Sequence, residues 1–162
     1  MRIDPMIPAD WLEASRIYEQ GIATGLATFE TQLPSWEEWD AAHLPHSRLV
    51  VRGERVLGWA ALSFTSKRPC YMGVAEVGIY VSPLIRGCGV GRALLDALLE
   101  SSETHGVWTL QAATIAENFP SLRLHARCGF RVVGRRERIA KLGDIWRDTI
   151  LTERRSTTVG LD

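Results

Sequence analysis

Apolar and polar residues alternate with two different periods along this chain, and the changes of period mark its secondary structure. A period of two, bounded by turn residues, predicts about seven strands, at 2–7, 48–51, 56–64, 76–81, 107–114, 130–133 and 145–151. A helical period predicts about four helices, from 10 to about 22, from 36, from 92 to 105 and from 120 to 128. The resulting order, β-α-α-β-β-β-α-β-α-β-β, predicts an α/β (α+β) fold with helices on both faces of a mixed central sheet.

Capping residues predict where several of these helices begin and end. Asp10 is placed to cap the first helix, and Ser35 with Glu38 three positions later forms a capping-box pattern before the second. Gly106 follows the third helix in the position of a C-terminal glycine cap. The polar tail from Ser156 is expected to fray.

Three alternating glycines lie between the fourth predicted strand and the third helix. The strand over 76–81 leads into the bend Ser82-Pro83-Leu84-Ile85-Arg86, which is followed by Gly87, Gly89 and Gly91. Glycine lets the backbone approach a ligand closely, and the first turn of a helix offers unpaired N–H groups at the positive end of its dipole. Together these features predict an anion site suited to a pyrophosphate.

Other interpretations of these glycines fit the chain less well. A Walker A loop requires Lys-Ser or Lys-Thr after the glycines, and a dinucleotide fingerprint places its first glycine directly after the strand. Neither condition holds here. The structural alternative to an anion site is a glycine-rich turn that begins a core helix. The pattern Arg86-x-x-Gly89-x-Gly91 resembles the pyrophosphate loop of the GNAT acetyltransferases, which bind acetyl-CoA. The resemblance implies the GNAT fold and acetyl-CoA as cosubstrate.

Size and charge exclude several classes of protein. The chain has the length of one domain, and we expect residues 1–162 to form it. Nineteen basic residues balance nineteen acidic ones, so no charge excess points to nucleic acid or a membrane surface. No apolar run approaches the ~20 residues of a membrane span, and the N-terminal segment does not resemble a signal peptide. Cys70, Cys88 and Cys128 form no CxxC pair and the histidines have no zinc-site spacing, so we expect free thiols in a cytoplasmic protein and no metal.

Acetyl transfer from a thioester to an amine needs a base, because free amines are mostly protonated at neutral pH. It also needs a donor for the developing oxyanion and an acid for the leaving thiolate. Glu76 is the first candidate base. It shares a strand face with Gly78 and Tyr80, and a carboxylate in this strand destabilises the fold unless it is exposed, paired or required for function. An ion pair with an arginine is the structural alternative. Because Pro83 cannot continue a sheet ladder, a backbone N–H at Val81-Ser82 is expected to be free for the oxyanion.

His125 is the second candidate for a catalytic role. Helical spacing places Ser121 and His125 on one face of a helix, with Asn118 at its start. A surface histidine and an ordinary asparagine cap are the structural alternatives.

Further motifs narrow the resemblance to one subgroup, the phosphinothricin and methionine sulfoximine N-acetyltransferases, over about residues 2–152. The motifs that carry it are Phe29-Glu30-Thr31, Trp36-Glu37-Glu38-Trp39, Ala75-Glu76, Ile79-Tyr80-Val81-Ser82-Pro83 and Arg123-Leu124-His125. The resemblance implies a homodimer that acetylates the amino group of a small amino-acid-like acceptor, with Glu76 as general base and His125 beside the thioester. The cofactor-binding residues that it implies are Tyr80, Val81, Arg86, Gly87, Cys88, Gly89, Val90, Gly91, Arg92, Asn118 and Ser121.

The resemblance also implies an acceptor pocket. An acceptor carboxylate pairs best with an arginine, and Arg68 matches a basic position of the subgroup. Phe29 and Glu30 match the pocket wall, and we add Tyr71 from the loop that carries Arg68. The segment between Arg68 and the strand of Glu76 is shorter than in relatives, which leaves the acceptor open, and a solvated loop is the alternative for Arg68.

Three other functions remain open at this point. An acetyltransferase for protein N-termini would need an open groove, whereas the tryptophan-rich loops favour an enclosed pocket. An acetyltransferase for polyamines would favour an acidic pocket rim, against which Lys67 and Arg68 argue. A non-catalytic acyl-CoA-binding module would require neither Glu76 nor His125.

Overall fold

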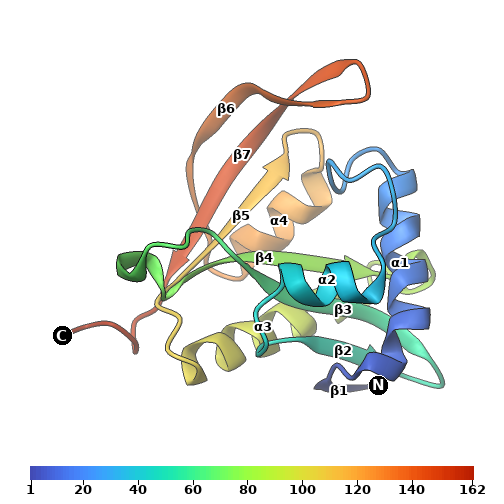
Figure 1. Cartoon of the computed structure of the whole chain (residues 1–162), viewed down its shortest axis with the longest axis horizontal. Helices are drawn as coiled ribbons and strands as arrows, with labels where there is room; N and C mark the ends of the chain where they lie inside the picture. The colour runs from blue at the N-terminus through green and yellow to red at the C-terminus, as the bar shows by residue number, and fades with distance from the viewer.

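Seven strands form one sheet in the computed structural model, which describes residues 1–162 (Figure 1). Their spatial order is β1-β2-β3-β4-β5-β7-β6. The strands are β1 (Arg2–Pro5), β2 (Leu49–Arg52), β3 (Val56–Phe64), β4 (Val74–Val81), β5 (Thr109–Ile115), β6 (Arg131–Leu142) and β7 (Ile145–Arg155). The helices are α1 (Trp11–Ala23), α2 (Trp36–Ala42), α3 (Val90–Thr104) and α4 (Phe119–Arg127). The predicted element order and the mixed α/β class are confirmed.

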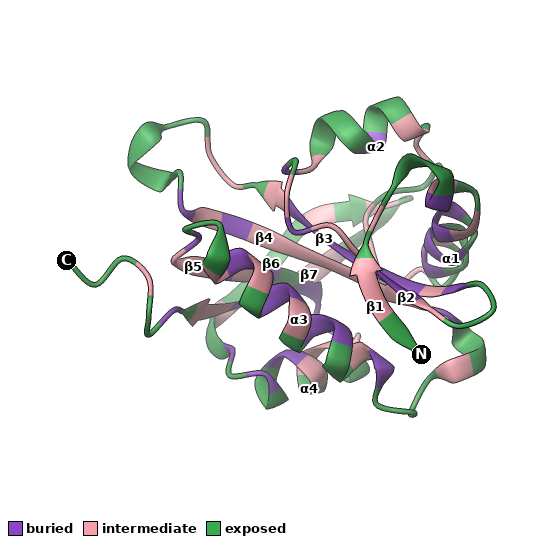
Figure 2. Ribbon diagram, turned by 90° about the horizontal axis from the view of Figure 1, so that it is seen from below, coloured by how far each residue is buried: buried purple, intermediate pink, exposed green.

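Helices cover both faces of the sheet, α1 and α2 on one and α3 and α4 on the other (Figure 2). Alternation along β3 explains the division, because successive side chains of a strand point to opposite faces. Trp59 packs with Tyr18 of α1 and Trp39 of α2. Leu62 belongs to the second cluster, with Leu94 and other leucines of α3. The two apolar clusters therefore fix the helices to opposite sides of one sheet.

The sheet divides between β4 and β5, its only parallel pair. These two strands pair only as far as Glu76 and Gln111. β4 continues to Val81 beside β3, and β5 continues to Ile115 beside β7. Beyond Glu76 and Gln111 the two halves of the sheet diverge, and a wedge opens between them (Figure 1).

The two C-terminal strands are longer than their sequence pattern predicts. β6 continues to Leu142 instead of ending at Val133, and with β7 it forms a hairpin that projects from the sheet (Figure 1). Most of β6 is exposed, so no alternation of apolar residues marks it in the sequence. Its register also shifts twice, and Arg138 adopts a positive φ of 43°.

Two predicted details near the chain ends are wrong. The Asp10 side chain does not cap α1. Its carboxylate instead accepts a hydrogen bond from the Ile7 N–H at 2.9 Å and pairs with the Arg52 guanidinium at 2.6 Å. The tail does not fray at Ser156, which is buried and donates a hydrogen bond to the Glu103 carboxylate at 2.9 Å. In both cases the polar side chain binds a partner distant in sequence, Arg52 for Asp10 and Glu103 for Ser156, which no local pattern indicates.

Candidate functional site

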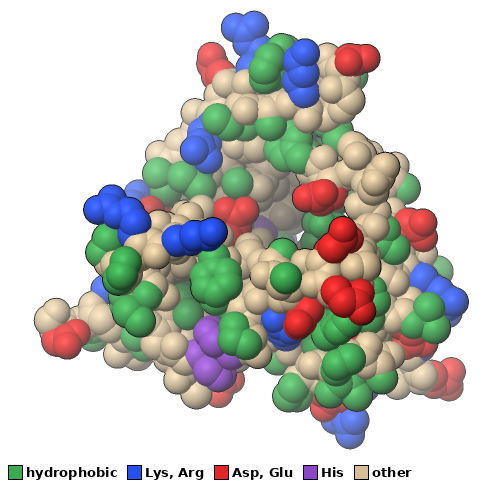
Figure 3. Space-filling model, in the orientation of Figure 1, with side chains coloured by type: hydrophobic (Ala, Val, Ile, Leu, Met, Phe, Trp, Pro, Cys, Tyr) green, Lys and Arg blue, Asp and Glu red, His purple; other side chains and the backbone are tan.

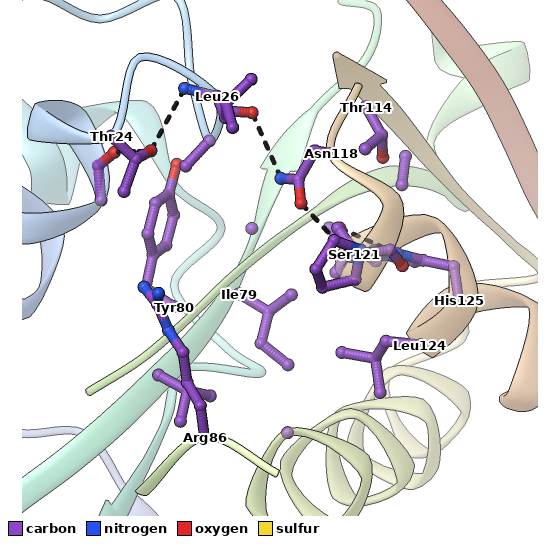
Figure 4. Close-up of a pocket in the computed structure, with 18 of the residues that line it drawn as sticks. Thr24, Leu26, Ile79, Tyr80, Arg86, Thr114, Asn118, Ser121, Leu124 and His125 are labelled. Carbon is purple, nitrogen blue, oxygen red and sulfur yellow. Dashed lines mark hydrogen bonds between the residues drawn. The ribbon is translucent and has the colours of Figure 1, made fainter. Parts of the chain in front are cut away.

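A cavity of about 510 Å³ fills the wedge between β4 and β5, and we call it the wedge cavity (Figure 4). Its walls combine the diverging strands with the glycine loop and α4. The lining residues from these elements are Val77, Gly78, Ile79, Tyr80 and Val81 of β4, Ala112, Ala113 and Thr114 of β5, Ile85, Arg86, Gly87, Gly89, Val90 and Gly91 of the loop and α3, and Asn118, Pro120, Ser121, Leu124 and His125 of α4. Most of the predicted cofactor-binding residues thus surround one space.

The glycine loop has the geometry of an anion site. Gly87 and Gly89 have φ of 80° and 77°, in the left-handed region that favours glycine. α3 begins directly after Gly89, and no side chain caps its first turn. The backbone N–H groups of that turn are therefore free to bind an anion at the positive end of the helix dipole.

Two predicted cofactor residues lie outside the wedge cavity. Arg92 does not line it and pairs with Asp96 at 2.7 Å, one helical turn further along α3. Cys88 is exposed, and its thiol is 3.9 Å from the Arg86 carbonyl oxygen. Neither side chain is placed to touch a ligand in this cavity.

Asn118 begins α4 and also ties it to the opposite rim of the wedge (Figure 4). Its Oδ1 accepts a hydrogen bond from the Ser121 N–H at 3.3 Å, so the expected cap is present. Its Nδ2 donates to the Leu26 carbonyl at 3.2 Å, in the loop that follows α1. One asparagine therefore joins the two sides of the cavity.

His125 is a buried, neutral histidine and not a surface one. Only 2% of it is exposed, and its Nδ1 lies 2.8 Å from the Ser121 carbonyl oxygen, which fixes the proton on Nδ1. Nε2 is buried without a partner, and the ring packs edge-on against Phe130 at 4.9 Å. Burial lowers the pKa of His125 below its ordinary value, so the ring stays neutral near pH 7. In this arrangement no ring nitrogen offers a proton to the wedge cavity.

A second cavity, of about 700 Å³, adjoins the first along β4 and is rich in aromatic side chains. We call it the aromatic cavity. Its lining includes Tyr18 of α1, Trp39 and His43 at α2, Trp59 and Ser63 of β3, Glu76 and Tyr80 of β4, and Thr28, Phe29, Glu30 and Gln32 of the loop between α1 and α2. Acidic side chains stand at the edge of the central hollow in Figure 3.

The two cavities adjoin along one wall. The residues that line both of them are Ala27, Val77, Gly78, Tyr80 and Ala113. Burial raises the pKa of Tyr80 above its ordinary value, so its hydroxyl remains protonated at this wall. A ligand in one cavity can therefore meet a ligand in the other at this shared wall.

Glu76 lies at the point where β4 and β5 separate, and it lines the aromatic cavity. Its Oε2 accepts a hydrogen bond from the Gln111 side-chain amide at 2.9 Å. No arginine pairs with it, so the predicted structural alternative is wrong. Glu76 is half-buried, and the bond from Gln111 is the one hydrogen bond that its carboxylate makes.

Backbone donors face the wedge, but not for the predicted reason. The Ser82 N–H, expected to be free beside the proline, donates to the Leu57 carbonyl at 2.8 Å. Alternation along β4 then directs the N–H groups of Val77, Ile79 and Val81 away from β3. Because β5 has diverged from β4 beyond the Glu76–Gln111 pair, the N–H groups of Ile79 and Val81 have no strand partner.

The predicted acceptor residues divide into two groups. Phe29 and Glu30 line the aromatic cavity. Arg68 and Tyr71 line neither cavity; the Arg68 guanidinium lies 5.7 Å from the Tyr71 ring centroid on the exposed loop between β3 and β4. The cavity walls from α1, α2 and β3 were missed, because Trp39 and Trp59 carry the same apolar signal as any core residue.

Comparison with known proteins identifies several relatives. Residues 11–130 match the model of the acetyltransferase (GNAT) family. The chain is 33% identical over 147 residues to the phosphinothricin N-acetyltransferase of Alcaligenes faecalis. This alignment covers 85% of the chain and 74% of the relative. It is 35% identical over 95 residues to the L-methionine sulfoximine/L-methionine sulfone acetyltransferase of Pseudomonas aeruginosa. That alignment covers 57% of this chain and 54% of the relative. Among solved structures, this chain superposes on a GNAT superfamily phosphinothricin acetyltransferase from Sinorhizobium meliloti in complex with acetyl-CoA, with a TM-score of 0.88 and 26% identity. The superposition covers 99% of this chain and 91% of that structure.

Proposed function

The chain belongs to the GNAT family of acetyltransferases, and we propose that it transfers acetyl from acetyl-CoA to the amino group of a small amino-acid-like acceptor. The acceptor class comes from the relatives, which are named for phosphinothricin and for methionine sulfoximine and sulfone. The observation that carries the proposal is the wall shared by the two cavities, with Glu76 at its end. A donor and an acceptor bound on the two sides of this wall would react without a covalent enzyme intermediate.

In the proposed complex, acetyl-CoA occupies the wedge cavity. Its pyrophosphate accepts hydrogen bonds from the first-turn N–H groups of α3, with Arg86 beside it. The acyl arm runs along β4, whose free N–H groups at Ile79 and Val81 can bind the thioester oxygen. As the tetrahedral intermediate forms, such preorganised donors stabilise the negative charge that develops on that oxygen.

The acceptor amine is bound in the aromatic cavity. The Glu76 carboxylate accepts a proton from the ammonium, and the free amine then attacks the thioester carbon. The carbon–sulfur bond then breaks, and the departing CoA thiolate takes up the second proton that the nitrogen loses as the amide forms. A thiol with an ordinary pKa of about 8.5 needs no strong acid to leave, so the neutral His125 is not required as a proton donor. We assign His125 a positioning role, because its Nδ1–H holds the Ser121 carbonyl at the cavity wall.

The compartment and assembly are part of the same proposal. All three cysteines are free thiols, as is usual in a reducing cytoplasm. No helix has the length and apolar content that crossing a membrane requires. Exposed apolar residues on the β6–β7 hairpin, including Ile139, Ile145 and Trp146, are suited to the interface of a homodimer. Sedimentation of the purified chain measures its mass in solution directly.

Release of free thiol from acetyl-CoA tests the proposed function. The acceptor panel contains methionine sulfone, methionine sulfoximine, phosphinothricin, free amino acids, spermidine and a short peptide. Release that depends on the sulfone, sulfoximine or phosphinothricin supports the proposal. Release with the peptide alone contradicts the acceptor class, and no release despite tight CoA binding favours a non-catalytic acyl-CoA-binding module.

A further inference from the structure

The aromatic cavity carries negative charge and no balancing cation. Three carboxylates line it, from Glu30, Glu38 and Glu76, and no lysine or arginine does. Glu38 is held by the Ser35 N–H at 2.8 Å in the capping box of α2, and Glu76 by Gln111. Glu30 is exposed and takes part in none of the ion pairs of the chain. Its carboxylate is therefore the one most available to a ligand.

The charge of Glu30 acts on the aromatic wall. Burial is the main cause that raises the pKa of Tyr18 and of Tyr80, and the negative charge of Glu30 raises both further. The Glu30 carboxylate thus lies close enough to two wall residues to affect their ionisation. A cation beside these rings would gain from this charge and from the faces of the aromatic side chains.

The basic residues that argued against a cationic acceptor are not at this cavity. Lys67 and Arg68 lie on the exposed loop between β3 and β4, and neither lines the cavity. A carboxylate beside Glu30 and Glu38, which are both exposed, would meet no opposing charge. An ammonium in the same place would meet two favourable charges and an aromatic wall.

We propose that this cavity also accepts small aliphatic diamines, one amino group being acetylated at Glu76 while the other, as an ammonium, is held by Glu30 against the aromatic wall. The inference rests on the proposed function, because it uses the same acceptor site. Glu76 takes one proton from the reacting ammonium, the free amine nitrogen bonds to the acetyl carbon, and the carbon–sulfur bond breaks. The nitrogen gives its second proton to the departing CoA thiolate, so the step ends with an amide and a thiol. The product is a monoacetylated diamine that keeps one ammonium.

Three matched series of acceptors test this proposal in the thiol-release assay. Diamines with three to six methylene groups are compared with n-alkylamines and ω-amino acids of the same length, and mass spectrometry confirms the monoacetylated product. At the best length we expect kcat/KM for the diamine to exceed that for the alkylamine about 5- to 10-fold, the worth of one exposed charge pair with a cation–π contact. The ω-amino acid, which puts a carboxylate beside Glu30, should react most slowly.

Variants then identify the residue responsible. Glu30→Gln should lower kcat/KM for the diamine about 5- to 10-fold more than for the alkylamine, so that the preference for the diamine is lost. Glu37→Gln, the same change on an exposed residue outside the cavity, should leave the preference intact. Equal rates for diamines and alkylamines at every length, or a preference that survives Glu30→Gln, would overturn the inference. Turnover of methionine sulfone without a diamine preference overturns this inference alone, whereas no thiol release with any acceptor overturns the proposed function as well.

Discussion

The side-chain amide of Gln111 donates a 2.9 Å hydrogen bond to the carboxylate of Glu76 across the only parallel strand pair of the sheet. These two residues are the last at which β4 and β5 pair. The bond therefore holds the carboxylate at the start of the wedge, beside the wall that the two cavities share. A base in this position can reach an amine in the aromatic cavity that approaches a thioester in the wedge cavity.

Replacement of this base should slow catalysis without weakening cofactor binding. We expect Glu76→Gln to reduce kcat/KM by about 10²–10⁴, the usual contribution of a general base. The dissociation constant of CoA, measured by calorimetry, should stay the same because Glu76 lines the aromatic cavity alone. Glu38→Gln is the matched control: Glu38 lines the same cavity, and glutamine also serves in a capping box. Equal losses in the two variants would remove Glu76 from the proposed role.

The hydrogen bond from Gln111 should affect catalysis only by positioning the Glu76 carboxylate. We expect Gln111→Leu to lower kcat about tenfold with little change in KM, because the carboxylate loses a charge-assisted hydrogen bond that fixes its position. In the Glu76→Gln background the same change should have almost no effect, which a double-mutant cycle measures. Additive losses would mean that Gln111 acts on the reaction by another route.

Gly21 of α1 makes room for the ring of Tyr80. A Cβ added at Gly21 would lie 2.8 and 2.9 Å from two ring carbons of Tyr80. Alanine usually stabilises a helix interior by about 1 kcal/mol over glycine. Here we expect Gly21→Ala to destabilise the protein by about 1–3 kcal/mol through overpacking, and to lower activity because Tyr80 lines both cavities.

Denaturant unfolding measures this effect, with Gly134→Ala as control. A Cβ at Gly134 of β6 would have no neighbour within 4 Å, so its free energy of unfolding should scarcely change. A gain in stability for Gly21→Ala would show that Tyr80 moves aside freely.

CoA binding at the glycine loop should depend on Arg86 and not on Arg92. Arg86 lines the wedge cavity, whereas Arg92 pairs with Asp96 outside it. We expect Arg86→Ala to weaken CoA binding about tenfold and Arg92→Ala to change it less than twofold, the first by loss of a charge beside the pyrophosphate. Titration calorimetry with CoA compares the two directly. The opposite order would place the phosphate binding on the exposed face of α3.

Histidine burial should make the protein less stable in mild acid. Burial lowers the pKa of His43, His46 and His125 from the ordinary value of 6.5, so below that pH the unfolded chain binds protons that the folded chain does not. The stabilisation is complete above about pH 7 and is lost as the pH falls below 6.5, by up to about 1.4 kcal/mol per pH unit for each such group. The pH slope of the free energy of unfolding should be smaller in His125→Asn. An unchanged slope would mean that His125 is protonated in the folded protein.

Local sequence patterns predicted the parts of this fold that depend on neighbouring residues. The glycine loop before α3 and the capping box at Ser35 could be predicted because their geometry is set within a few positions. The same reasoning failed at Asp10, whose carboxylate is taken by Arg52, 42 positions away. It also failed in β6, which is too exposed for its strand pattern to be read.

The candidate site was predicted in outline for the same reason. Glu76 and the loop residues lie on one strand and its continuation, so their proximity follows from the chain itself. Gln111 reaches Glu76 through a parallel pairing that α3 connects, and no local signal marks it. Arg68 was expected at the acceptor pocket by resemblance, yet a loop side chain has no periodicity that fixes its direction. The aromatic walls were hidden because Trp39 and Trp59 are buried like core residues.

Initial rates of thiol release, measured over a matrix of acetyl-CoA and methionine sulfone concentrations, test most directly whether donor and acceptor react directly at the wall shared by the two cavities. Direct transfer between the two cavities predicts that release requires the sulfone and that the double-reciprocal lines intersect. Parallel lines would indicate a covalent acetyl-enzyme, and release that does not depend on the acceptor would contradict the proposed reaction.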